Sequence, residues 1–264
     1  QLTFMLCRGT SVANIPAYFT RVQKRAKELW DLLDERPDLA GPWHQLFKQV
    51  QSPRHVISEL LQNADDAGAT EASADIQNGE FVFTHNGEDF KEEHFESLCK
   101  FGYSNKRSLH TIGFRGIGFK STFSLGDQVR LFTPTLSTAF NRERFTEPVW
   151  IHKPNSFSHT AIQVTIKDEH RQAELEKNLS EWFQSSASLL FFHNLRSLRI
   201  CGQEVRWQSL GAGPVPESEW MALASKPEEQ YLLIRSAPEA FPPDALEEIR
   251  QERMVLSDDE AAFP

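Results

Sequence analysis

Three short motifs follow one another through the first half of the chain, and their order constrains the fold more than any other feature of the sequence. The first is Glu-Leu-Leu-Gln-Asn-Ala-Asp-Asp-Ala over 59–67. The second is Asn86-Gly87, and the third is Ile-Gly-Phe-Arg-Gly-Ile-Gly-Phe-Lys-Ser over 112–121. Each is too short to support a function alone, because such patterns also occur by chance. Their combination predicts one binding site assembled from three segments.

The first motif lies on a helix expected over 52–67. At about 100° per residue, Glu59, Asn63 and Asp66 share one face, and apolar residues occupy the opposite one. Glu59 is a candidate general base for the attack of water on a γ-phosphate, and Asn63 is a candidate ligand of Mg²⁺, which prefers oxygen. Ala67 borders both faces and is small enough to touch a flat purine. The alternative is an amphipathic helix with a solvated polar face.

The second motif follows an alternating strand expected over 80–85. Asn-Gly in this position is the strongest local signal for a hairpin turn, which is one interpretation. In the other, Asn86 accepts a hydrogen bond from an adenine amino group and Gly87 permits close approach of the backbone. The sequence leaves both open.

The third motif places Gly113, Gly116 and Gly118 where a loop enters a helix. Glycines here leave backbone N–H groups and the positive helix end available to an anion such as a phosphate. The spacing matches neither a Walker loop nor a Rossmann fingerprint. The polar segment 102–111 before it suits a loop over the phosphates, in which Lys106 is either a phosphate contact or a solvated lysine.

Composition limits the function classes. The chain has 264 residues, 39% of them hydrophobic, which is enough for one large domain. No apolar run reaches the ~20 residues of a membrane span, and no signal peptide is recognisable. Three scattered cysteines predict a reduced, cytoplasmic setting. From residue 211 onward twelve acidic residues face four basic ones, while the rest is nearly neutral, so nucleic acid is not indicated as a partner.

The order of helical and strand patterns predicts an α/β protein, in the form of an α+β two-layer sandwich with a mixed sheet covered on one face by helices. Three regions are expected: an N-terminal helical segment over 1–50 that packs on the body, a nucleotide-binding domain over 51–210, and an acidic extension over 211–264. The expected helices are two within 16–50, then 52–67, 91–100, one beginning near 116, and 169–186. The expected strands are 71–77, 80–85, 128–133, 148–151, 160–167, 189–192, 196–201, 204–208 and 231–234, with a linker over 211–216.

The motifs resemble those of the GHKL, or Bergerat-fold, ATPases, which include heat-shock-90 chaperones, type II topoisomerases, MutL proteins and sensor histidine kinases. The wording of the first and third motifs is most similar to the sacsin-like branch. The resemblance covers about residues 50–210 and implies a Bergerat ATP-binding fold that uses ATP and Mg²⁺. It implies Glu59 as the catalytic residue and Asn63 as the metal ligand. The nucleotide-binding positions it implies are Asp66, Ala67, Gly113, Gly116, Gly118 and Thr160. The full set of residues predicted to bind the nucleotide adds Asn63, Asn86, Gly87, Lys106, Arg115, Ile117 and Phe119.

Two positions depart from the family pattern. Most of the superfamily has Asp-x-Gly where this chain has Asn86 followed directly by Gly87, and His159 stands where a glycine usually precedes Thr160. These departures bear on adenine selectivity. The segment 102–111 is also short for a large lid.

The expected function is slow, Mg²⁺-dependent ATP hydrolysis that drives a conformational change in a larger protein. The chain starts at Gln1 and stops at Pro264, so we expect a segment of a longer polypeptide. ATP and ADP, other domains of that polypeptide and a second copy in a homodimer are the expected partners, with no membrane partner. The alternatives are an ATP-sensing switch and an interaction domain with little or no hydrolysis.

Overall fold

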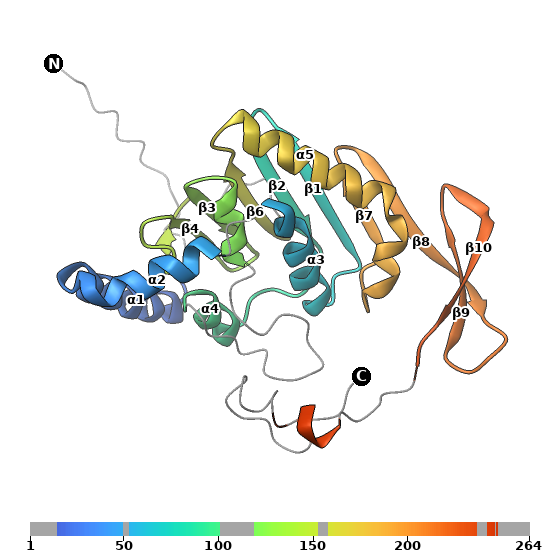
Figure 1. Cartoon of the computed structure of the whole chain (residues 1–264), viewed down its shortest axis with the longest axis horizontal. Helices are drawn as coiled ribbons and strands as arrows, with labels where there is room; N and C mark the ends of the chain where they lie inside the picture. Colours follow the sequence, from blue (N-terminus) through green and yellow to red (C-terminus); the bar gives the residue numbers. More distant parts are fainter. Residues whose placement is uncertain are drawn as a thin grey trace.

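The structure, a computed structural model, describes residues 15–49, 53–100, 119–152, 158–236, 242–245 and 247 (Figure 1). Its helices are α1 Ala17–Glu35, α2 Pro37–Gln49, α3 Val56–Asp66, α4 Glu92–Leu98 and α5 Glu169–Gln184, with the 3-10 helices η1 Pro53–His55, η2 Phe119–Ser124 and η3 Ser186–Phe191. Its strands are β1 Glu71–Gln77, β2 Glu80–His85, β3 Gln128–Phe132, β4 Ser137–Asn141, β5 Val149–Trp150, β6 Thr160–Thr165, β7 Ser197–Ile200, β8 Gln203–Ala212, β9 Ser218–Leu223 and β10 Lys226–Ile234.

The strands form a mixed sheet in the order β10-β9-β8-β7-β1-β2-β6-β3-β4-β5. β1 and β7 are parallel, and the other neighbouring pairs are antiparallel. α3 and α5 lie across one face of the central strands (Figure 1). The predicted fold class, a mixed sheet with helices in α+β order, is therefore confirmed.

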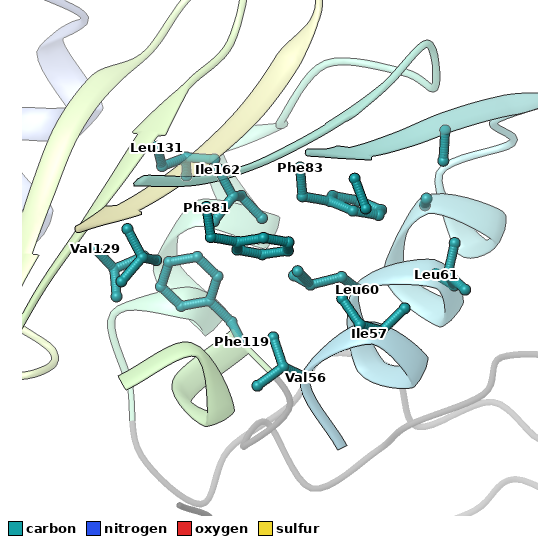
Figure 2. Close-up of a cluster of buried hydrophobic side chains, with 14 of the residues drawn as sticks. Val56, Ile57, Leu60, Leu61, Phe81, Phe83, Phe119, Val129, Leu131 and Ile162 are labelled. Carbon is teal, nitrogen blue, oxygen red and sulfur yellow. The ribbon is translucent and has the colours of Figure 1, made fainter. Parts of the chain in front are cut away.

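The hydrophobic core lies between α3 and the central strands (Figure 2). Leu60 of α3 points toward Phe81 and Phe83 of β2, and Phe119 of η2 points into the same cluster. Phe81 and Phe83 alternate with half-buried residues along β2, as a strand with one covered face requires. The core thus joins the helix of the first motif to the last residues of the third.

α1 packs on the opposite end of the body from β10. Phe19 stacks on Phe95 of α4 with ring centroids 5.3 Å apart, and Trp30 donates from Nε1 to Thr146 Oγ1 at 2.8 Å. α1 carries charged residues throughout, and within the described part of the chain no helix is long and apolar enough to cross a membrane.

Two elements near the third motif and α5 differ from the prediction. The apolar stretch 189–192 forms part of η3 and its end, with Leu189 buried and Phe191 84% exposed, so the predicted strand is wrong. A short apolar run fits either period, and here the polypeptide turns too tightly for a strand. The helix expected near 116 is observed as η2, from Phe119 onward.

The region after residue 210 also differs. The expected linker over 211–216 is instead the end of β8 and the turn into β9, and Gly213 donates its N–H to Ser218 O at 2.8 Å. Gly211 has a φ of +115°, which favours glycine and explains the signal that resembled a linker. β4 and β9 were not predicted, and β10 is longer than the strand expected over 231–234.

Candidate functional site

The first motif forms α3 and its C-terminal cap. Glu59, Asn63 and Asp66 are half-buried on the helix, whose apolar residues enter the core, so the predicted division of faces is confirmed. The helix begins at Val56 after the turn of η1 and ends in a Schellman motif, in which Gly68 N bonds to Asp65 O at 2.8 Å and Ala69 N to Ala64 O at 2.9 Å. Gly68 has a φ of +71°, as expected for the terminator of this helix.

Asp65 is a residue of the first motif that the sequence argument missed. Its carboxylate is 2% exposed and accepts three backbone N–H groups, from His193 at 2.9 Å, Asn194 at 2.7 Å and Leu195 at 2.9 Å. Asn194 Nδ2 also donates to Asp65 O at 3.0 Å. Asp65 therefore fastens the end of α3 to the segment that leads into β7.

The helical period could have identified Asp65. Asp65 lies four positions after the buried Leu61, so it is on the apolar face of the helix. An acid on that face needs hydrogen-bond donors, because an unpaired buried carboxylate is costly. Asp66, the acid predicted to line the nucleotide, lies on the polar face.

The second motif does not form a hairpin turn. The turn between β1 and β2 is made by Asn78-Gly79, whose φ values of +53° and +76° suit a type I′ turn. Asn86 and Gly87 come after β2 and lead toward α4. The hairpin interpretation of Asn86-Gly87 is therefore wrong.

The carboxamide of Asn86 is bonded within the protein. Oδ1 accepts the N–H groups of Thr70 at 2.9 Å and Glu71 at 3.0 Å, and Nδ2 donates to Thr70 Oγ1 at 2.9 Å. Both lone pairs of Oδ1 are thus used. This geometry gives Asn86 the task of holding the loop between α3 and β1, and it leaves the expected adenine contact as a prediction without structural support.

His85, Gly87 and Ala67 meet at one point. A Cβ added to Gly87 would lie 2.7 Å from Ala67 O and 3.0 Å from Ala67 Cβ and His85 Nδ1, so only glycine fits. Gly87 N–H donates to His85 Nδ1 at 3.1 Å. Gly87 thus allows a close approach to Ala67, while the predicted approach to an adenine stays a prediction.

His85 is the second residue that the sequence argument missed. The family's Asp-x-Gly spacing places its acid two positions before glycine, and the residue two positions before Gly87 is His85. Burial, with a smaller contribution from His159, lowers the pKa of His85 to about 4. The imidazole is therefore neutral at pH 7.

Thr160 begins β6 directly opposite His85 in the antiparallel ladder. Opposite residues in such a ladder project from the same face with Cβ atoms ~5 Å apart. Thr160 is 2% exposed, and its Oγ1 has no hydrogen-bond partner among the residues that the structure describes. The structure thus brings Thr160 next to His85, near Ala67 and Gly87.

Most of the third motif lies outside the described residues. This applies to Gly113, Arg115, Gly116, Ile117 and Gly118, and also to Lys106 in the segment before the motif, so their roles stay predictions. Phe119 is described, and it is a buried core residue. It opens η2, which packs against α3.

Lys120, near the end of the third motif, bonds to the residues at the C-terminal end of α4. Its Nζ donates to Leu98 O at 2.6 Å and to Lys100 O at 2.9 Å, and the side chain is 1% exposed. Burial lowers the pKa of Lys120 to about 8. Residues 98–100 and η2 are therefore held side by side.

A metal in this site would have few protein ligands. Within the described ranges, no group of three or more His, Cys, Asp or Glu side chains is placed to hold an ion. Magnesium usually keeps several waters and takes one or two protein oxygens, which suits the single predicted ligand Asn63.

Comparison with known proteins gives distant relatives. No protein-family model matches the chain. Sacsin from Homo sapiens is 26% identical over 133 residues, which cover 43% of this chain and 3% of sacsin. The DNA mismatch repair protein MutL from Chlorobium chlorochromatii is 25% identical over 193 residues, which cover 67% of this chain and 29% of MutL. Protein NO VEIN from Arabidopsis thaliana is 39% identical over 79 residues, or 28% of this chain and 3% of that protein.

The similarity to these proteins is partial. The alignments span less than a third of each of these relatives. Sacsin and MutL both carry the GHKL type of domain that the motifs resemble, so the two findings point in the same direction. The chain is distantly similar to GHKL-type proteins, and its similarity selects no branch among them.

Proposed function

We propose that this chain binds ATP with Mg²⁺ and hydrolyses it slowly, as a GHKL module of Bergerat type and sacsin-like character. The observation that carries the proposal is the packing of α3 against η2. α3 bears the predicted base and metal ligand, and η2 directly follows the predicted phosphate-binding glycines. The last residues of the third motif thus lie next to the first motif, which supports a triphosphate shared between the two.

Two features of the structure suit a purine nucleotide. Thr160 offers a buried hydroxyl without a partner among the described residues, and Gly87 removes a side chain beside Ala67. A flat ring needs such small residues beside it, and a polar ring edge needs such a hydroxyl. Thr160 lies on the face of the sheet that α3 covers, because it belongs to the same row of β6 as Ile162.

Asn63 would hold Mg²⁺ through its side-chain oxygen. When bound, the ion would neutralise charge on the phosphates. Glu59 lies one helical turn before Asn63 and would accept the proton of the attacking water. The chain's own contribution is to orient that water and to place backbone N–H groups of the third motif on the phosphates.

The substitution Glu59→Ala tests this function. We expect hydrolysis to fall by roughly 100-fold or more, the usual contribution of a positioned base, while the affinity for ATP changes little. Glu93→Ala, on the exposed face of α4, is the matched control and should retain both. Phosphate release and calorimetric titration are measured on the same samples. Unchanged hydrolysis in Glu59→Ala would place the base elsewhere.

The same pair of measurements separates an enzyme from a sensor. Saturable ATP binding with no phosphate release would identify a nucleotide-dependent switch. Absence of binding, checked by thermal stabilisation, would leave only an interaction domain, since ligand at ~100 times its Kd should add ~2.7 kcal/mol.

We further propose that turnover drives a conformational change in a longer protein. This is supported by the small share of each relative that the chain covers. Association through a homodimer belongs to the same proposal.

A further inference from the structure

Two buried polar residues lie side by side at one edge of the central strands: His85 is the last residue of β2, and Thr160 is the first residue of β6. His85 continues the row of Phe81 and Phe83 that faces α3, and Thr160 starts the matching row of β6. The row alternates along each strand, so both polar side chains face the helix side. His85 is 7% exposed and Thr160 2%. Two polar groups thus stand where the pattern otherwise places core residues.

The hydrogen bond from Gly87 determines which ring nitrogen of His85 can donate to a ligand. Because Gly87 N–H donates to Nδ1, that nitrogen carries no proton, and the neutral ring carries its proton on Nε2. The imidazole can then donate from Nε2 and cannot accept there. Among the described residues, its side chain has no other hydrogen bond.

The hydroxyl of Thr160 complements this donor. Of the five buried side-chain oxygens that lack a partner in the described part of the chain, Thr160 Oγ1 is the one opposite His85. A hydroxyl can donate or accept by rotation. The pair therefore presents one obligatory donor beside one adaptable group.

We propose that His85 and Thr160 read the edge of a purine through its acceptor atoms and not through its 6-amino group. On adenine, Nε2–H donates to ring N1 and the hydroxyl accepts from the amino group. On hypoxanthine, Nε2–H donates to O6 and the hydroxyl accepts from N1–H. The inference rests on the proposed function, and it predicts a site that accepts purine triphosphates with either a 6-amino or a 6-oxo group.

An acidic side chain at position 85 would recognise a different atom of the base. A carboxylate only accepts hydrogen bonds, so in the pose in which it pairs with the 6-amino group of adenine it would face O6 of hypoxanthine, which also only accepts. A site built for one hydrogen-bonding pattern rejects an analogue that leaves its polar groups unpaired. Base selectivity therefore reports which atom His85 presents.

The test is titration of the unmodified chain with ATP, inosine triphosphate and purine riboside triphosphate in the presence of Mg²⁺. Because the comparison changes the ligand and not the protein, folding defects do not enter. We expect each analogue to bind within about fivefold of ATP, since each retains an acceptor for Nε2–H. A preference of about fivefold or more for ATP over inosine triphosphate would overturn the inference.

The variant His85→Asp tests the opposite selectivity. In His85→Asp the carboxylate should restore dependence on the 6-amino group and weaken inosine triphosphate relative to ATP by about fivefold or more. Equal binding of the two nucleotides by this variant would contradict a role for position 85 in reading the base. If the unmodified chain binds ATP but rejects inosine triphosphate, the inference fails and the proposed function stands. If it binds none of the three, both fail.

Discussion

The polar side chains on the two sides of the loop that follows α3 differ in whether their hydrogen bonds are made within the chain. On one side, Asp65 and Asn86 have their oxygens filled by backbone N–H groups of the same chain. On the other side, Thr160 Oγ1 has no partner among the described residues, and His85 uses Nδ1 alone. Asp65 and Asn86 thus hold the fold together, whereas the unfilled atoms of Thr160 and His85 are the ones that the proposed nucleotide site would use. The comparison separates scaffold from site inside one motif region.

The largest expected effect is on the scaffold side. Asp65→Ala leaves three backbone N–H groups without their acceptor, so we expect the free energy of unfolding to fall by about 3–5 kcal/mol. Denaturant unfolding measures this change. Asp38→Ala, at an exposed surface pair with Arg36, is the control and should cost less than ~1 kcal/mol. A loss for Asp65→Ala as small as that of the control would break the comparison.

The next effect concerns His85 and pH. Its pKa is lowered from 6.5 to about 4, so between these values the unfolded chain binds more protons than the folded one. The stability that neutral His85 contributes is fully present above about pH 6.5 and is lost as the pH falls toward 4. Between about pH 7 and about pH 5 we expect a loss of roughly 2 kcal/mol in the free energy of unfolding.

Two variants isolate that contribution. The difference in the free energy of unfolding between the two pH values should shrink in His85→Asn. It should persist in His170→Asn, because the side chain of His170 is 80% exposed. Denaturant titrations at both pH values provide the measurement. The same pH dependence in both variants would show that His85 is not the titrating group.

A smaller effect separates Asn86 from the base-reading residues. Asn86→Ala removes three hydrogen bonds at an exposed side chain, so we expect ~1–2 kcal/mol of destabilisation. The affinity for ATP should change by less than about threefold, because the carboxamide holds the loop and not the ligand. Calorimetric titration with ATP measures this affinity. A loss of ATP affinity without a loss of stability would restore Asn86 as an adenine contact.

The smallest effect is expected at Thr160. Thr160→Val removes a hydroxyl without a described partner, so stability should change by less than ~1 kcal/mol. Thr122→Val is the matched control, because Thr122 Oγ1 is buried and donates to Phe119 O at 2.6 Å. It should destabilise by ~1–2 kcal/mol. Equal losses in thermal or denaturant unfolding would show that Thr160 Oγ1 is already satisfied.

Much of the fold was predictable from local patterns. The 3.6-residue period of 56–66, the glycine at 68 and the alternation of 80–85 each correspond to an observed element. Local patterns failed where they were ambiguous. The apolar run 189–192 fitted a strand as well as a turn of helix, and the glycines and prolines of 211–216 concealed a tight turn between paired strands.

The site was predictable in part, for a related reason. The polar face of α3 follows from spacing, and the structure retains it. The roles of Asp65 and His85 depend on partners from distant segments, the N–H groups of 193–195 and the opposite strand β6. No local pattern encodes such partners. Alternation along β2 does place His85 on the buried face with Phe83, and that signal was available in the sequence.

Photolabelling with 2-azidoadenosine triphosphate shows where a purine lies on the chain. We expect the label on peptides from the ends of β2 and β6 or from the C-terminal turn of α3, and we expect excess ATP to suppress it. Label confined to β9 and β10, or label that ATP does not suppress, would contradict a nucleotide site at this end of the sheet.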